Sequence, residues 1–205
     1  MTHLDIDAGA STLVGVTAGA LLATLGGLLA GQFEHHLRRL EREKSAALLF
    51  GEILAALRLI LRLAYEAHGR GDPFGSITLR ILRAAQRETQ IYDRNRETLF
   101  DVRDPALRAR THLLLLQVSL TLDSIFEAIQ TIDDGPSQSR AGKASAADKT
   151  AAAVGARDGG FAFLMDFRPA LPELIGKYEK IAKQTFDAHD LILQGPLPQA
   201  EPAAL

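Results

Sequence analysis

The sequence predicts an all-α protein, in which one N-terminal transmembrane helix continues into a cytoplasmic antiparallel helical bundle. Three observations predict this fold. Residues 8–33 contain no charged side chain. The remaining chain repeats apolar residues at helical spacings of three and four, and Gly and Pro fall between these periodic stretches. The averages conceal this division, because 47% hydrophobic and 23% charged residues over 205 positions are typical of a soluble globule.

The uncharged segment 9–31 follows a short N-terminus, residues 1–8, which we expect outside the cytoplasm. At about 1.5 Å per residue a helix over this segment reaches roughly 35 Å, enough for a hydrocarbon core of about 30 Å. A cleaved signal peptide would need a basic start, whereas MTHLDID carries Asp5 and Asp7 and no Lys or Arg. A buried core helix this long would rarely lack a charge. The segment therefore predicts a membrane anchor.

Basic residues flank this segment on its C-terminal side only. They are Arg38, Arg39, Arg42 and Lys44. Cytoplasmic flanks of membrane helices carry the excess of Lys and Arg. We therefore expect the N-terminus outside and residues 32–205 in the cytoplasm, with the basic group near lipid headgroups.

The anchor also carries a small residue at every fourth position. The series is Ser11, Gly15, Gly19, Ala23, Gly27 and Gly31. Small side chains at this spacing let two membrane helices approach closely. We therefore expect self-association through Gly15, Gly19, Ala23 and Gly27. The alternative is that Gly and Ala are merely frequent in the segment.

After the anchor, residues 32–68 are expected to continue as a helix, polar at first and then apolar. The apolar stripe comprises Leu49, Phe50, Ile53, Leu54, Leu57, Ile60, Leu61 and Ala64. Glu52, Arg58 and Arg62 interrupt it, and a charge at the centre of a membrane span costs about 2.5–3.5 kcal/mol. A bundle helix is therefore expected, ending where Gly and Pro follow in GRGDPFG.

Two further helices complete a membrane-proximal bundle over residues 32–132. The first is expected over about 77–98, with a buried side made of Ile77, Ile81, Ala84, Ala85, Ile91 and Tyr92. The second is expected over about 105–132, because Asp104 is a good N-cap and Pro105 suits the first helical position. Its core stripe is Leu107, Thr111, Leu114, Val118, Leu122, Ile125, Ile129 and Ile132, widened by Leu113, Leu115, Leu116 and Leu120.

The C-terminal third alternates between polar and apolar stretches. Residues 133–160 are rich in Gly, Ser, Ala and Asp, and we expect a flexible loop there with at most a transient helix at 146–154. Residues 161–193 are expected to supply an apolar cluster and a C-terminal helix that packs on the bundle. The proline-rich residues 194–205 are expected to be a disordered tail.

No catalytic, cofactor-binding or metal-binding site is predicted. The chain has no cysteine, which excludes thiolate zinc sites and cysteine nucleophiles. Gly142-Lys143 lacks the flanking residues of a phosphate loop, with Ser137 and Ala144 in their places. The six histidines form no metal-ligand pair at helical spacing. If the protein is an enzyme, we expect its site in a polar cavity lined by Tyr178, Asp187 and His189. In the arginine-rich segment about 77–98, acidic residues alternate with the basic ones and no aromatic stacking platform accompanies them, which argues against nucleic acid as a partner.

Charge is divided along the chain. Residues 34–110 carry 15 Lys and Arg against 11 Asp and Glu, whereas residues 111–205 carry 8 against 12. The basic half would face an anionic leaflet. Membrane lipid is therefore an expected partner.

A resemblance to known proteins rests on two stretches, HHLRRLEREKSAALLFGEI and IYDRNRETLFDVRDPALR, of which the second precedes a long apolar helix. The chain resembles small bacterial single-pass inner-membrane proteins that have a cytoplasmic helical domain and no established activity. The resemblance covers residues 10–130. It implies anchoring in a bacterial inner membrane and a helical bundle. It supplies no catalytic residue.

We therefore expect a non-enzymatic, membrane-anchored interaction or scaffolding protein that forms a homo-oligomer and binds an unknown protein partner. One alternative is a subunit of a transmembrane signalling system, with the helix over 32–68 transmitting motion to the bundle. Another is an enzyme with an unrecognised site. A membrane-disrupting protein is disfavoured by the large charged domain.

Overall fold

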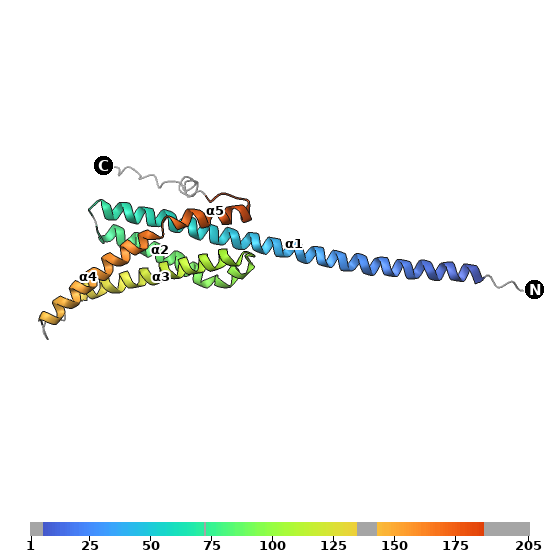
Figure 1. Ribbon diagram of the computed structural model, residues 1–205, viewed down its shortest axis with the longest axis horizontal. Coiled ribbons are helices and arrows are strands. Elements are labelled where there is room, and N and C mark those ends of the chain that lie inside the picture. Colours follow the sequence, from blue (N-terminus) through green and yellow to red (C-terminus); the bar gives the residue numbers. More distant parts are fainter. Residues whose placement is uncertain (1–5, 72, 135–142, 187–205) are drawn as a thin grey trace, which may run out of the picture. The chain divides into compact units, whose positions relative to one another are not determined.

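The computed structural model describes residues 6–71, 73–134 and 143–186, except for the side chains of 6–26, 28–30 and 143–146. Its elements are α1 (Ile6–Gly69), α2 (Ser76–Arg94), the 3-10 helix η1 (Arg96–Asp101), α3 (Pro105–Asp134), α4 (Lys143–Asp166) and α5 (Ala170–Ala182) (Figure 1). No strand occurs among these residues, so the predicted all-α class is confirmed. The chain divides into two compact units, Met1–Arg42 and Glu43–Leu205, of which the second holds the core.

The predicted helix over 32–68 is confirmed as part of α1, which ends at Gly69. In the following turn, the described residues Gly71 and Phe74 have positive φ, at 94° and 64°. Glycine adopts such angles freely, whereas a side chain makes them costly. The chain therefore reverses direction here through a turn that is strained at Phe74.

The start of α3 agrees with the sequence. The Asp104 carboxylate Oδ1 accepts hydrogen bonds from the backbone N–H groups of Ala106 at 2.9 Å and Leu107 at 3.2 Å. These are two of the donors that a helix start leaves unpaired. The side chain thus acts as the predicted N-cap, and α3 begins at Pro105.

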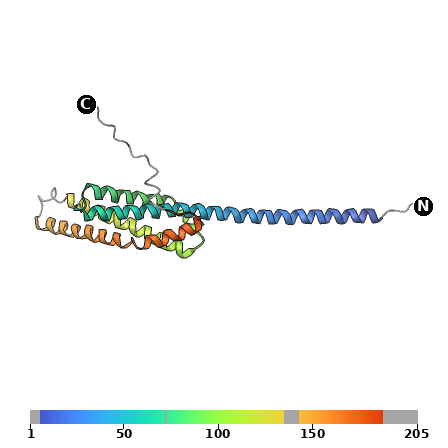
Figure 2. The ribbon, with the colours of Figure 1, turned by 90° about the horizontal axis from the view of Figure 1, so that it is seen from above.

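Helix α3 is central to the second unit. It packs against α2, α4 and α5, most extensively against α4, and Figures 1 and 2 both show α3 and α4 side by side. The predicted stripe is buried at Leu107, Thr111, Leu114, Val118, Leu122 and Ile125. Of the leucines expected to widen it, Leu115 is buried, whereas Leu113, Leu116 and Leu120 are exposed.

The expected loop over 133–160 requires correction, because residues 143–160 form most of α4. This stretch is rich in alanine, the best helix former, and α4 gains tertiary contacts along α3. Gly160 lies so close to α3 that a Cβ there would stand 2.9 Å from Ile125 Cγ1. The composition lacked large apolar residues, but α4 packs through small ones.

The C-terminal helix is also shorter than expected over 161–193. Residues 161–166 belong to α4, a turn follows, and α5 ends at Ala182. Lys183 then adopts the left-handed conformation, with φ 56°, which terminates the helix. The expectation for residues 194–205 lies outside the described residues.

In α2 the buried side agrees only in part with the predicted one. Ala85 and Tyr92 are buried as predicted, whereas Ile77 and Ile91 are 61% and 39% exposed. Thr78, Leu82 and Thr89 complete the buried side. The Thr89 hydroxyl donates to the Gln86 carbonyl oxygen at 2.9 Å. Because that hydrogen bond satisfies the hydroxyl locally, a polar residue occupies the inner side of the helix.

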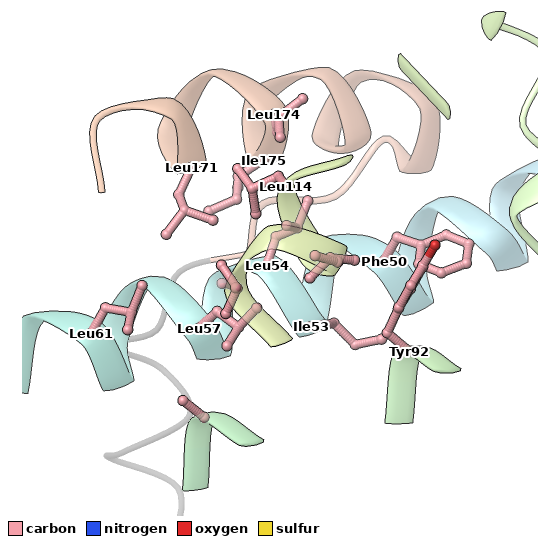
Figure 3. Close-up of a cluster of buried hydrophobic side chains, with 14 of the residues drawn as sticks. Phe50, Ile53, Leu54, Leu57, Leu61, Tyr92, Leu114, Leu171, Leu174 and Ile175 are labelled. Atoms are coloured by element: carbon pink, nitrogen blue, oxygen red, sulfur yellow. The ribbon is translucent and has the colours of Figure 1, made fainter. Parts of the chain in front are cut away.

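Helices α1 to α5 all contribute side chains to the core of the second unit, α4 through Phe161 and Leu164. Figure 3 shows one part of this core, where Phe50, Ile53, Leu54, Leu57 and Leu61 of α1 face side chains of α2, α3 and α5. The latter are Tyr92, Leu114, Leu171, Leu174 and Ile175. The Phe50 ring contacts both Tyr92 and Tyr178, each at a centroid distance of 6.1 Å. These three rings lie where the helices meet.

Among the residues whose side chains are described, one helix, α3, is long and apolar enough to cross a membrane. Core helices of soluble proteins share this length and composition, and α3 buries nine residues in the second unit. Almost all side chains of the predicted anchor over 9–31 lie outside the described ones, so the anchor stays a prediction.

Candidate functional sites

The four residues expected to mediate self-association all lie in α1. The side chains at positions 15, 19 and 23 are outside the described residues. Gly27 is exposed, and a Cβ placed there would have no described atom within 4 Å. No described segment therefore packs against α1 at Gly27.

The basic residues Arg38, Arg39, Arg42 and Lys44 are all exposed side chains of α1. Arg38 forms an ion pair with Glu34, one turn earlier, and both side chains are more than 60% exposed. Exposed pairs of this kind contribute at most about 1 kcal/mol. The cluster therefore keeps its positive charge accessible to solvent or to an anionic surface.

The second unit begins with a buried charge. Glu43 is only 9% exposed, and its carboxylate binds Arg103 twice. Oε2 pairs with the guanidinium Nε at 3.0 Å, and Oε1 accepts from the Arg103 backbone N–H at 3.0 Å. Arg108 donates to the Val102 carbonyl oxygen at 2.7 Å. These contacts fix the segment before α3 to the first turn of α1 within this unit.

Two tyrosine hydroxyls make side-chain hydrogen bonds to residues of α3. The Tyr92 hydroxyl and His112 Nδ1 share a 2.6 Å hydrogen bond, and the Tyr178 hydroxyl and Thr111 Oγ1 share one of 2.9 Å. Burial raises the pKa of Tyr178 to about 12 and raises that of Tyr92 as well. Both phenols therefore remain protonated at neutral pH, as hydrogen-bonding groups of the core.

An aromatic cluster closes the far end of α1. The His68 ring stacks on Phe161 at 4.2 Å between centroids, and Phe74 meets both rings edge-on. The Arg157 guanidinium lies over the Phe74 ring at 4.2 Å, a favourable cation–π geometry. These contacts hold the strained turn at Phe74 against α4.

Two polar side chains of α3 make hydrogen bonds to α2. His112 Nδ1 shares one with the Tyr92 hydroxyl, and the Asp123 carboxylate accepts one from the Gln86 side-chain amide. Asp187 and His189 lie outside the described residues, and the Tyr178 hydroxyl is used within the core. Among the described residues, no group of three or more acids and histidines could hold a metal ion.

Sequence reasoning missed the contacts that join distant segments. The partners in these contacts are dozens of residues apart, so no local spacing connects them. The three pairs are Glu43 with Arg103, Thr111 with Tyr178, and Gly51 with Phe186. One signal was present. Gly51 interrupts an otherwise strong helical stripe, and a glycine in a helix interior costs stability that close packing can offset.

Comparison with protein-family models, curated proteins and solved structures gives no match. The fold and the sites described above therefore define only a class, an all-helical protein with a hydrogen-bonded aromatic core.

Proposed function

We propose that this chain is a membrane-anchored helical interaction or scaffolding protein. In this proposal residues 9–31 cross a bacterial inner membrane with the N-terminus outside, and the second unit is an antiparallel bundle in the cytoplasm. The observation that carries it is the contrast between an uncharged 9–31 and a unit from Glu43 onward that buries its own core. The exposed Arg38, Arg39, Arg42 and Lys44 support the orientation.

Topology is tested by protease protection. Trypsin added to intact spheroplasts should leave the second unit uncut, and cleavage should follow only after the membrane is permeabilised. Exchanging Arg38, Arg39, Arg42 and Lys44 for Gln should weaken the orientation bias. Digestion of the second unit in intact spheroplasts would overturn the proposed orientation.

Self-association belongs to the same proposal, through Gly15, Gly19, Ala23 and Gly27. The exposure of Gly27 supports it, since no described atom lies within 4 Å of a Cβ placed there and small residues let two membrane helices approach closely. The paired change Gly19→Ile with Gly27→Ile should lower the yield of crosslinked dimer in membranes.

A control for this pair replaces Leu21 and Leu25 with Ile. At about 100° per residue, these positions lie on the other side of the helix from Gly19 and Gly27. The control should leave the dimer yield unchanged. An equal yield from both double variants would show that the small-residue series does not mediate association.

A signalling subunit is the second candidate, favoured by the Glu43–Arg103 contact. That contact joins the first turn of α1 in the second unit to the segment that starts α3. A rotation of α1 at Glu43 would therefore be passed to the central helix. Cysteine crosslinking along residues 32–42 should show two patterns, with and without stimulus, and a single invariant pattern would count against signalling.

A further inference from the structure

The last described residues turn back onto α1. Helix α5 ends at Ala182, Lys183 takes the left-handed conformation at φ 56°, and Phe186 becomes buried with 8% of its surface exposed. Its ring lies directly against Gly51 in α1, where any Cβ would overlap the ring atoms. The C-terminal segment is thus attached to α1 at a point that only glycine permits.

This contact depends on a notch in α1. Ala47 and Ala55, one turn on either side of Gly51, are also buried small residues, so three small side chains follow one another along this face. A glycine inside a helix destabilises it relative to alanine. Gly176 in α5 shows no such need, because a Cβ there would meet nothing within 4 Å. The notch at Gly51 therefore serves the aromatic ring.

Few interactions hold the segment closed. Of residues 183–186 only Phe186 is buried, and its backbone N–H donates to Glu179 Oε1 at 2.9 Å. Two terms oppose closure, namely the ordering of four backbone residues and the left-handed conformation of Lys183, which is unfavourable for a residue with a Cβ. The closed state of this segment is therefore favoured by burial of the Phe186 ring and opposed by backbone strain at Lys183 and by the loss of conformational entropy.

We propose that Phe186 is a releasable latch, which fastens the C-terminal segment to α1 at Gly51 and opens without unfolding the helices. Opening frees the chain that follows α5 and uncovers an apolar notch on α1 that fits one aromatic ring. The latch is thereby a conformational device of the second unit. It holds whether or not the proposed membrane function is correct.

The test is hydrogen exchange of the full chain in detergent micelles, followed by mass spectrometry. The reporters are the amides of Gln184 and Phe186, which donate to the Glu179 carbonyl oxygen and carboxylate when the latch is closed. Gly51→Ala should raise their exchange at least tenfold, because the added methyl displaces the ring. Phe186→Ala should do the same by removing the ring. The core amides of α3 should be unaffected.

Two further variants separate a latch from ordinary packing. Gly176→Ala adds the same methyl group in open space and should leave the reporters unchanged. Lys183→Gly should slow their exchange several-fold, because glycine relieves the left-handed strain, although glycine ordinarily loosens a chain. Unchanged exchange in both Gly51→Ala and Phe186→Ala would overturn the proposal. So would a parallel rise throughout α3, or faster exchange in Lys183→Gly.

Discussion

The hydrogen bond between Tyr178 and Thr111 provides a sharp test of the core. Both side chains are fully buried, and their oxygen atoms lie 2.9 Å apart. Replacing Tyr178 by Phe keeps the ring in place and leaves the Thr111 hydroxyl without this partner. An unsatisfied buried hydroxyl costs about 1–3 kcal/mol, and a threonine on a helix recovers part of that by bonding to a carbonyl one turn earlier. We therefore expect a loss of about 1–2 kcal/mol.

The double variant gives the decisive comparison. Thr111→Val alone should cost a similar amount, because it leaves the tyrosine hydroxyl unpaired. Tyr178→Phe with Thr111→Val removes both polar groups and keeps their shapes, which can be nearly neutral. The loss in the double variant should therefore be no greater than the larger single loss, and well below the sum of the two single losses. Strict additivity would show that the two hydroxyls do not interact.

The assay is urea unfolding of the full chain in detergent micelles, followed by far-ultraviolet circular dichroism. Tyr65→Phe is the control, because Tyr65 is 53% exposed and its change should stay within about 0.5 kcal/mol. If Tyr178→Phe proves as neutral as Tyr65→Phe, the hydroxyl contributes nothing and the reasoning is refuted.

The same tyrosine makes stability depend on alkaline pH. Burial raises the pKa of Tyr178 from its ordinary value of 10.0 to about 12, so the folded state holds the proton more tightly than the unfolded state. This stabilisation is complete below the unfolded pKa and is lost as pH rises through the folded pKa. The loss is about 1.4 kcal/mol per pH unit between them. Titrating urea midpoints from pH 9 to 12 should show a steeper decline for the natural chain than for Tyr178→Phe. Equal declines would contradict the assignment.

Four further variants are measured by the same urea assay. Asp104→Ala should cost about 1 kcal/mol by removing the N-cap of α3, and an unchanged midpoint would show that the cap bonds contribute nothing. Gly159→Ala should stabilise α4 by up to about 1 kcal/mol, because a Cβ there would meet no described atom within 4 Å. Gly160→Ala should destabilise the protein, because its Cβ would press against the Ile125 side chain. Equal effects of the two variants would contradict this packing. Glu43→Gln should cost about 1 kcal/mol. The amide keeps an oxygen that accepts from the Arg103 backbone N–H, but the charge that pairs with the half-exposed Arg103 guanidinium is lost. An unchanged midpoint would show that this ion pair does not stabilise the contact between α1 and the segment before α3.

The extent to which the sequence predicts this fold differs between helices. In α3 the stripe from Leu107 to Ile125 is buried as expected, because a dominant apolar series leaves one possible inner face. In α2 the apolar residues are sparse and arginines surround them. Burial there follows the fit of Tyr92 and Leu82 into the core, and Ile77 and Ile91 remain outside. A weak pattern leaves the choice of face to the neighbouring helices.

The candidate sites were less predictable, for a related reason. The sequence alone predicted the Asp104 cap, which involves adjacent residues. The partner of Thr111, by contrast, lies 67 positions away on α5, and its identity depends on how three helices meet around Phe50. The helix over 143–160 was missed because its stability comes from close contact with α3, as at Gly160. Composition alone does not register such packing.

Small residues at a spacing of four occur in both parts of α1, and their surroundings differ. Ala47, Gly51 and Ala55 are buried, and the ring of Phe186 from the same chain lies against Gly51. At Gly27, in the other unit, a Cβ would meet no described atom. A surface of small residues gains stability only when another segment packs on it. Crosslinking between chains therefore tests whether a second copy packs on the anchor series, and exchange at Phe186 tests the latch.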